Sequence, residues 1–104
     1  MMQSGYEIDQ VFVRKRSGRY ELLIISLDPS GAQRRETFTY DVPNKLTAVQ
    51  QAGRHMAGRG DTDRADDLRL RVETRGNLHD DVSLKRVFIE TFKRVRDDLD
   101  DDIL

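Results

Sequence analysis

The sequence of 104 residues contains no cysteine. Disulfide bonds, thiolate metal sites and a cysteine nucleophile are therefore excluded. Histidine is also scarce, and the chain has two, His55 and His79. His79 precedes Asp80 and Asp81, and a carboxylate can orient an imidazole for acid–base chemistry, but no further nucleophile or ligand lies nearby in the sequence. We therefore expect no enzymatic activity, no metal ion and no cofactor.

Long apolar segments are also missing. No apolar run approaches the ~18 residues that a membrane-spanning helix needs. The start of the chain, Met-Met-Gln-Ser-Gly-Tyr-Glu, lacks the apolar core of a signal peptide. These two absences predict a cytoplasmic protein with no membrane partner.

The charged residues are numerous but nearly balanced. They make up 36% of the chain, the hydrophobic residues make up 37%, and the net charge is -1. Disordered chains combine low hydrophobicity with a large net charge, so this composition favours a folded protein. We expect one domain over residues 1–96, followed by an acidic tail over residues 97–104.

Lysine is rare among the basic residues, and the four lysines are Lys15, Lys45, Lys85 and Lys93. A surplus of arginine is typical of phosphate contacts, but it also follows from a base composition that favours arginine codons. The charge is uneven along the chain. Residues 1–60 hold nine bases and six acids (+3), whereas residues 61–104 hold nine bases and thirteen acids (-4).

The segment 20–27 is apolar on both of its alternating faces. In an extended chain Leu23 and Ile25 point to one side, and Leu22 and Ile24 point to the other. A strand with two apolar faces needs cover on both sides and a neighbour at each edge. We therefore place it inside a small sheet.

Three further segments alternate like strands, at 6–16, 34–42 and 68–74. Ser17 and Gly18 suit a tight hairpin between the first strand and segment 20–27. The Asp-Pro-Ser-Gly sequence at 28–31 suits the next turn, because proline and glycine fall where a turn favours them. The first 42 residues therefore predict a three-stranded antiparallel meander.

Two segments have the three- and four-residue spacing of helices. The first is about 12–14 residues long, begins at the cap Asn44 and stops near Gly58. The second runs from Asp81 to about Leu99 with an acidic start. Their predicted buried stripes are Leu46, Val49, Ala52, Gly53 and Met56 in the first helix, and Leu84, Val87, Phe88, Thr91, Phe92, Val95 and Leu99 in the second.

These elements predict an α+β fold. We expect a four-stranded antiparallel sheet with the order β-β-β-α-β-α along the chain and with both helices packed on one face. One face of segment 20–27 is then left without a helix. A second subunit is the simplest cover for that face, so we expect a homodimer.

The segment 57–67 is a polar loop with four aspartates, Asp61, Asp63, Asp66 and Asp67. Carboxylate oxygens are ligands for hard cations, but the spacing is not that of an EF-hand loop and the closing glutamate is missing. A solvated acidic loop is the simpler interpretation, so we expect no metal ion here.

Two features of the last helix indicate a contact surface. Helical geometry places Ile89 away from the apolar stripe, among Lys85, Arg86, Lys93 and Arg96. An apolar residue in a basic patch is typical of a binding surface, although single exposed apolar residues are common. The helix then ends in five aspartates that repel one another at the negative end of the helix dipole, where we expect fraying unless a basic partner docks. They are Asp97, Asp98, Asp100, Asp101 and Asp102.

We therefore expect a small non-enzymatic interaction protein that binds a protein partner, with the basic patch and the acidic tail as its binding residues. The alternative is a nucleic-acid-binding module that uses a basic hairpin tip together with the basic face of the last helix. The tip residues are Arg14, Lys15, Arg16 and Arg19. Convergence of the two basic groups on one surface would favour nucleic acid, and divergence would favour a protein partner.

Overall fold

The computed structural model describes residues 5–59, 69–74, 77–79 and 81–103. The first part of the chain folds as the predicted antiparallel meander. Its strands are β1 (Glu7–Arg16), β2 (Arg19–Leu27) and β3 (Gln33–Tyr40). Strand β2 has a neighbour at each edge, as its two apolar faces required.

Both turns of the meander form at the predicted residues. Ser17 and Gly18 have φ angles of 52° and 78°, the left-handed conformation that a tight two-residue hairpin needs at both positions. In the second turn the amide of Gly31 donates to the carbonyl oxygen of Asp28 over 2.9 Å. The Asp28 carboxylate accepts the amides of Ser30 and Ala32, so local polar residues close this turn.

The prediction of a purely antiparallel four-stranded sheet was wrong. Strand β4 (Arg69–Thr74) pairs with β1 in parallel, and β4 pairs with an additional short strand, β5 (Asn77–His79). The sheet order is β3-β2-β1-β4-β5, and the order along the chain is β-β-β-α-β-β-α. The free edges of the meander, β1 and β3, run in the same direction. The helix before β4 returns the chain to the end of the sheet where β1 and β3 begin. Strand β4 therefore runs parallel to whichever of these two strands it joins.

The helices are α1 (Lys45–Arg59) and α2 (Val82–Ile103). The predicted caps are present, because the side chains of Asn44 and Asp81 accept the amides of Thr47 and Leu84 at 2.9 Å. Helix α2 is longer than predicted, since its helical backbone continues through the acidic segment to Ile103.

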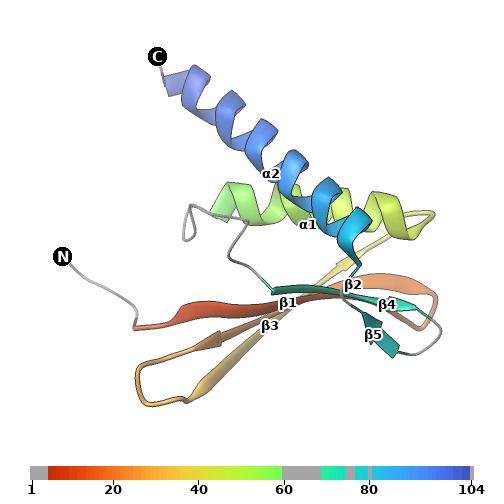
Figure 1. The fold of residues 1–104 in the computed structure, drawn as a ribbon, viewed down its shortest axis with the longest axis vertical. Helices are drawn as coiled ribbons and strands as arrows, with labels where there is room; N and C mark the ends of the chain where they lie inside the picture. The colour runs from red at the N-terminus through yellow and green to blue at the C-terminus, as the bar shows by residue number, and fades with distance from the viewer. Residues whose placement is uncertain (1–4, 60–68, 75–76, 80, 104) are drawn as a thin grey trace.

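Both helices lie on one side of the sheet, as predicted (Figure 1). Helix α1 contacts β1 and β2, whereas α2 packs mainly against α1 and reaches β4. The main core is buried between the sheet and the helices. It is formed by Val11, Val13, Leu22, Ile24, Ala48, Val49, Ala52, Met56, Ala57, Leu70, Val72, Phe88 and Phe92.

The buried stripe of α1 was partly wrong at its start. Leu46 is 47% exposed, whereas Ala48 and Ala57 are buried. Small residues therefore make up much of the buried side of α1, and Gly53 lies against the α2 backbone. In α2 the side chains of Phe88, Thr91 and Phe92 are buried, as the periodicity predicted.

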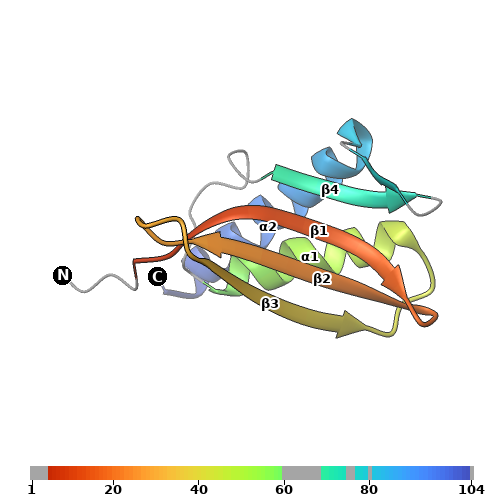
Figure 2. The ribbon, with the colours of Figure 1, turned by 90° about the horizontal axis from the view of Figure 1, so that it is seen from below.

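No described helix covers the other side of the sheet. Figure 2 views the molecule from this side, with the strands in front of both helices. A second apolar cluster of Phe12, Leu23 and Ile25 lies here, and these side chains are 7%, 4% and 6% exposed. We call this the helix-free face. Because its apolar groups are already shielded, it does not supply the reason for dimerisation that the sequence suggested.

Candidate functional site

The predicted basic hairpin tip divides between the two sides of the sheet. Nε of Arg14 lies 2.7 Å from Oε1 of Glu21, its cross-strand neighbour. Lys15 lies on the opposite side, with Nζ 5.6 Å from the ring centroid of Tyr20, a residue packed against the main core. Arg16 and Arg19 face each other across the hairpin and are exposed.

Three of these tip residues point away from the helices. Arg14 lies two residues beyond Phe12 on β1, so both side chains project from the helix-free face. Arg16, two residues further, and its partner Arg19 project from the same face. The basic residues of α2 lie on the helix side (Figure 1). The two predicted basic groups therefore do not converge on one surface.

Helix α2 carries a shallow groove on its outer side. The described residues that line this groove of ≈ 400 Å³ are Val82, Lys85, Arg86, Ile89, Glu90 and Lys93. Four of these, Lys85, Arg86, Ile89 and Lys93, belong to the patch predicted from the sequence. We call Val82, Lys85, Arg86, Ile89 and Lys93 the outer stripe of α2. Their spacing of three and four residues places them along one side of the helix.

Two details of the patch differ from the prediction. Ile89 is half-buried and packs partly against the main core, so it is less isolated than its helical angle suggested. Arg96 is not among the described residues that line the groove. Its Nη1 instead donates to the carbonyl oxygen of Ala57 at 3.5 Å, near the end of α1. Arg96 therefore joins the two helices.

Sequence reasoning missed Val82, which is 75% exposed and is the most exposed of the large apolar side chains described. The signal was present, because Val82 lies two helical turns before Ile89. Val82 directly follows the capping residue Asp81 and lies outside the predicted apolar stripe of the helix.

The acidic residues of the predicted tail continue α2. Figure 1 shows this end of α2 rising away from the sheet. Asp97 and Asp98 are exposed on the helix. The side chains of Asp100, Asp101 and Asp102 lie outside the described part of the chain.

Of the two histidines, His55 has a side chain that the structure describes. The His55 ring packs against Phe38, with ring centroids 4.1 Å apart. The side chain of His79, Asp80 and the four aspartates of the 57–67 segment lie outside the described residues. In the part of the chain that the structure describes, no group of three or more His, Asp or Glu side chains is arranged to hold a metal ion.

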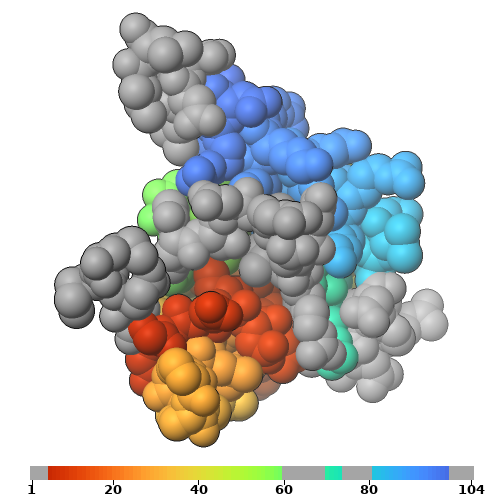
Figure 3. Space-filling model, turned by 60° about the vertical axis from the view of Figure 1, so that its left-hand side comes forward, coloured from red at the N-terminus to blue at the C-terminus, as the bar shows by residue number. Residues whose placement is uncertain are grey.

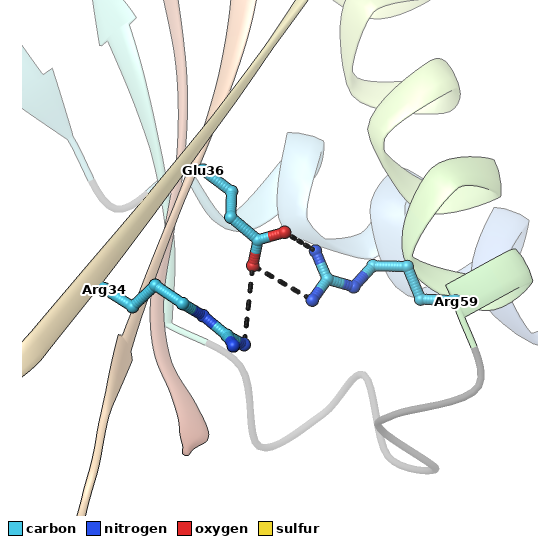
Figure 4. A network of polar contacts seen from close by, with 3 residues as sticks. All are labelled: Arg34, Glu36 and Arg59. Atoms are coloured by element: carbon cyan, nitrogen blue, oxygen red, sulfur yellow. Dashed lines mark hydrogen bonds and ion pairs between the residues drawn. The ribbon is translucent and has the colours of Figure 1, made fainter. Parts of the chain in front are cut away.

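An ion-pair network joins β3 and α1, and no sequence pattern predicted it. Both terminal nitrogens of Arg59 lie 3.1 Å from the Glu36 carboxylate oxygens (Figure 4). Arg34 lies 3.7 Å from the same carboxylate, and its guanidinium carbon lies 4.5 Å from the centroid of the Tyr6 ring. A bidentate pair of this kind fixes the end of α1 over the edge strand. It couples segments that are 23 residues apart, which is why local patterns did not show it.

A second depression of ≈ 520 Å³ lies where the start of β1 meets the end of β2. Figure 3 shows this region at the opposite end of the view from α2. Residues 5–9 and 27–29 line it. The Asp28 carboxylate is engaged in its own turn, and its hydrogen bonds to the Ser30 hydroxyl and backbone amides lower the pKa of Asp28 from its ordinary 3.8. The carboxylate is therefore committed to the turn.

Comparison with protein-family models, curated proteins and solved structures gives no match to this chain. Among the described residues, no helix combines the length and the hydrophobicity needed to cross a bilayer.

Proposed function

We propose that this protein is a small non-enzymatic interaction protein that binds a protein partner through the outer stripe of α2. The observation that carries the proposal is the exposure of Val82, 75%, in a groove that also contains Ile89. Valine has one strongly preferred rotamer in a helix, and the helix backbone is already ordered, so covering Val82 costs little conformational entropy.

The border of the groove defines the chemistry of the partner. Lys85, Arg86 and Lys93 supply three positive charges, and Glu90 supplies one negative charge. Apolar residues two turns apart on a helix are the anchors of helix–groove and helix–helix recognition. We therefore propose a partner segment that presents apolar side chains flanked by carboxylates.

A second copy of this chain is the first such partner to test. Helix α2 is basic along its outer stripe and acidic from Asp97 onward. Two α2 helices in antiparallel orientation would place the basic part of each opposite the acidic end of the other. This arrangement is isologous, as a two-fold dimer requires. Pairing through α2 would explain a homodimer, whereas the shielded helix-free face does not.

Light scattering over a range of protein concentrations tests self-association, with Val82→Lys as the disrupting variant. Leu46→Lys is the matched control, because it places the same charge at Leu46 of α1, the other exposed large apolar residue that the structure describes. If the partner is a second copy, wild type and Leu46→Lys form dimers and Val82→Lys is monomeric. Equal dimerisation of all three proteins would contradict the use of the outer stripe for self-association.

If the wild-type protein is monomeric, a photo-crosslinking residue at the exposed neighbour Ser83, which leaves Val82 in place, captures the partner, with position 46 as the control. The captured protein is then purified and titrated calorimetrically against wild type, Val82→Lys and Lys93→Gln. We expect binding to wild type and at least tenfold weaker binding to Val82→Lys, about 1.4 kcal/mol. Equal affinity for all three would overturn the proposed function.

A further inference from the structure

The helix-free face holds more arginine than any predicted site. Residues directly opposite each other on neighbouring strands share a face. Arg71 lies opposite Phe12, and Arg35 lies opposite Ile25, so both project from the same face as the second apolar cluster. Strand pairing thus brings arginines from four strands onto one surface. They are Arg14, Arg16, Arg19, Arg35 and Arg71.

The acidic residues on this face do not cancel the arginines. Glu21 is paired with Arg14 at 2.7 Å, and a carboxylate oxygen of Glu73 accepts the backbone amide of Lys15 at 2.9 Å. Glu7 lies opposite Leu27, at the end of the face remote from the hairpin. Glu73 keeps its negative charge when it accepts an amide, and Asp41 continues the alternation of Thr37 and Thr39 just past the end of β3. Five arginines therefore share this face with four carboxylates, which leaves a small positive surplus although the whole chain has a net charge of -1.

Three of the arginines are exposed and available. Arg16, Arg19 and Arg35 form no ion pair with a described residue, and each is exposed. Arg35 lies opposite Ile25, and Ile25 is six residues beyond Arg19 along β2. At about 3.4 Å per residue, the positive track is about 20 Å long.

Exposed hydrogen-bonding side chains also lie on this face. On the edge strand β3 they are Gln33, Thr37 and Thr39, which alternate with residues of the helix side. Hydroxyl and amide groups next to arginine are typical phosphate ligands. The apolar cluster beneath is at most 7% exposed, so a protein partner would find little apolar surface to bury in the centre of this face.

We infer that the helix-free face binds the phosphate backbone of nucleic acid. Its positive track complements the phosphates, and its polar edge strand adds hydrogen bonds. Phe12 is 7% exposed and so offers no open ring on which bases can stack. Binding is therefore independent of base sequence. This surface lies on the opposite side of the sheet from the outer stripe of α2. Nucleic-acid binding here can therefore be tested independently of partner binding by α2.

Fluorescence anisotropy with labelled mixed-sequence oligonucleotides, single-stranded and duplex, tests the inference. Three phosphate contacts predict that affinity falls about 20-fold for a single strand, and about 40-fold for a duplex, between about 50 and 200 mM salt. Replacing Arg35 or Arg19 by Gln weakens binding and reduces the slope of log affinity against log salt by about 0.7–0.9. Replacing Arg16, Arg19 and Arg35 together abolishes the salt-dependent binding.

The matched controls are Arg54→Gln and Arg94→Gln. Both residues are exposed and lie on the helices, so each variant removes one charge from the opposite side of the sheet. These variants retain wild-type affinity if the site is local. Equal weakening by Arg54→Gln and Arg35→Gln would reduce the effect to net charge and overturn the inference. Equal binding of polyglutamate, or no oligonucleotide binding at low salt, would also overturn it. Thermal unfolding of each variant verifies that it is folded.

Discussion

Gly53 of α1 lies directly against Phe88 of α2: a Cβ atom on Gly53 would be 2.9 Å from the Phe88 carbonyl oxygen and 3.1 Å from Cβ of Thr91. The nearest atom belongs to the helix backbone, which cannot move away as a flexible side chain can. Glycine is therefore the residue that allows α1 and α2 to approach this closely.

The first prediction is that Gly53→Ala destabilises the fold. The clash forces the helices apart, and overpacking of this kind costs about 1–3 kcal/mol, partly offset by the better helix propensity of alanine. Gly58→Ala is the control within the same helix, because a Cβ there meets no atom within 4 Å. It leaves stability unchanged or raises it by up to about 1 kcal/mol. Urea unfolding measures both variants, and equal stability of the two would refute the close-packing argument.

The second prediction concerns the Glu36–Arg59 pair. Glu36→Gln lowers the free energy of unfolding by about 1–2 kcal/mol, because the bidentate pair is partly shielded from water. Arg34→Gln costs less, since Arg34 is 41% exposed and lies 3.7 Å from Glu36. A double-mutant cycle between Glu36→Gln and Arg59→Gln isolates the coupling from the other contacts of Arg59. A coupling energy near zero would show that this pair does not fix the end of α1.

The third prediction is a loss of stability at alkaline pH. Burial raises the pKa of Tyr40 from 10.0 to about 12, and its hydroxyl has no hydrogen-bond partner among the described residues. Above pH 10 the unfolded chain ionises Tyr40 while the folded protein keeps the proton, so the unfolded state is favoured. The stability linked to protonated Tyr40 is fully present below pH 10 and is lost as the pH rises through 12.

Tyr40→Phe removes this titration. Its stability should change less than that of the wild type between pH 10 and 12, as measured by urea unfolding at several pH values in that range. Below pH 10 the variant should be as stable as the wild type or slightly more stable, because the unpaired buried hydroxyl is gone. Parallel pH profiles of the two proteins would exclude Tyr40 as the source of the effect.

The fourth prediction concerns the β1–β2 hairpin. Ser17 has a φ of 52°, and asparagine tolerates this left-handed conformation better than serine. Ser17→Asn should raise the melting temperature slightly. Ser17→Val should lower stability by about 1 kcal/mol or more, because a β-branched residue is strained there. A melting temperature that rises in Ser17→Val would contradict the turn geometry.

Local patterns predicted the elements whose causes are local. Alternating side chains fixed the three meander strands, and Asn44 and Asp81 marked the helix starts. The periodicity of α2 also located most of its outer stripe. Arg96 was placed with that stripe because its angle on an isolated helix is close to that of Ile89. Its contact with the carbonyl of Ala57 depends on where α1 ends in space.

By itself the sequence determined the α+β class, the meander with its two turns, and which residues of β2 share a face, because these follow from spacings of a few residues along the chain. The tertiary structure decided what depends on segments far apart in the chain. It placed β4 parallel to β1, shielded the second apolar cluster and separated the two predicted basic groups. It also gathered the arginines of four strands on one face. Strand pairing joins residues such as Phe12 and Arg71, and no pattern within either segment encodes that neighbour.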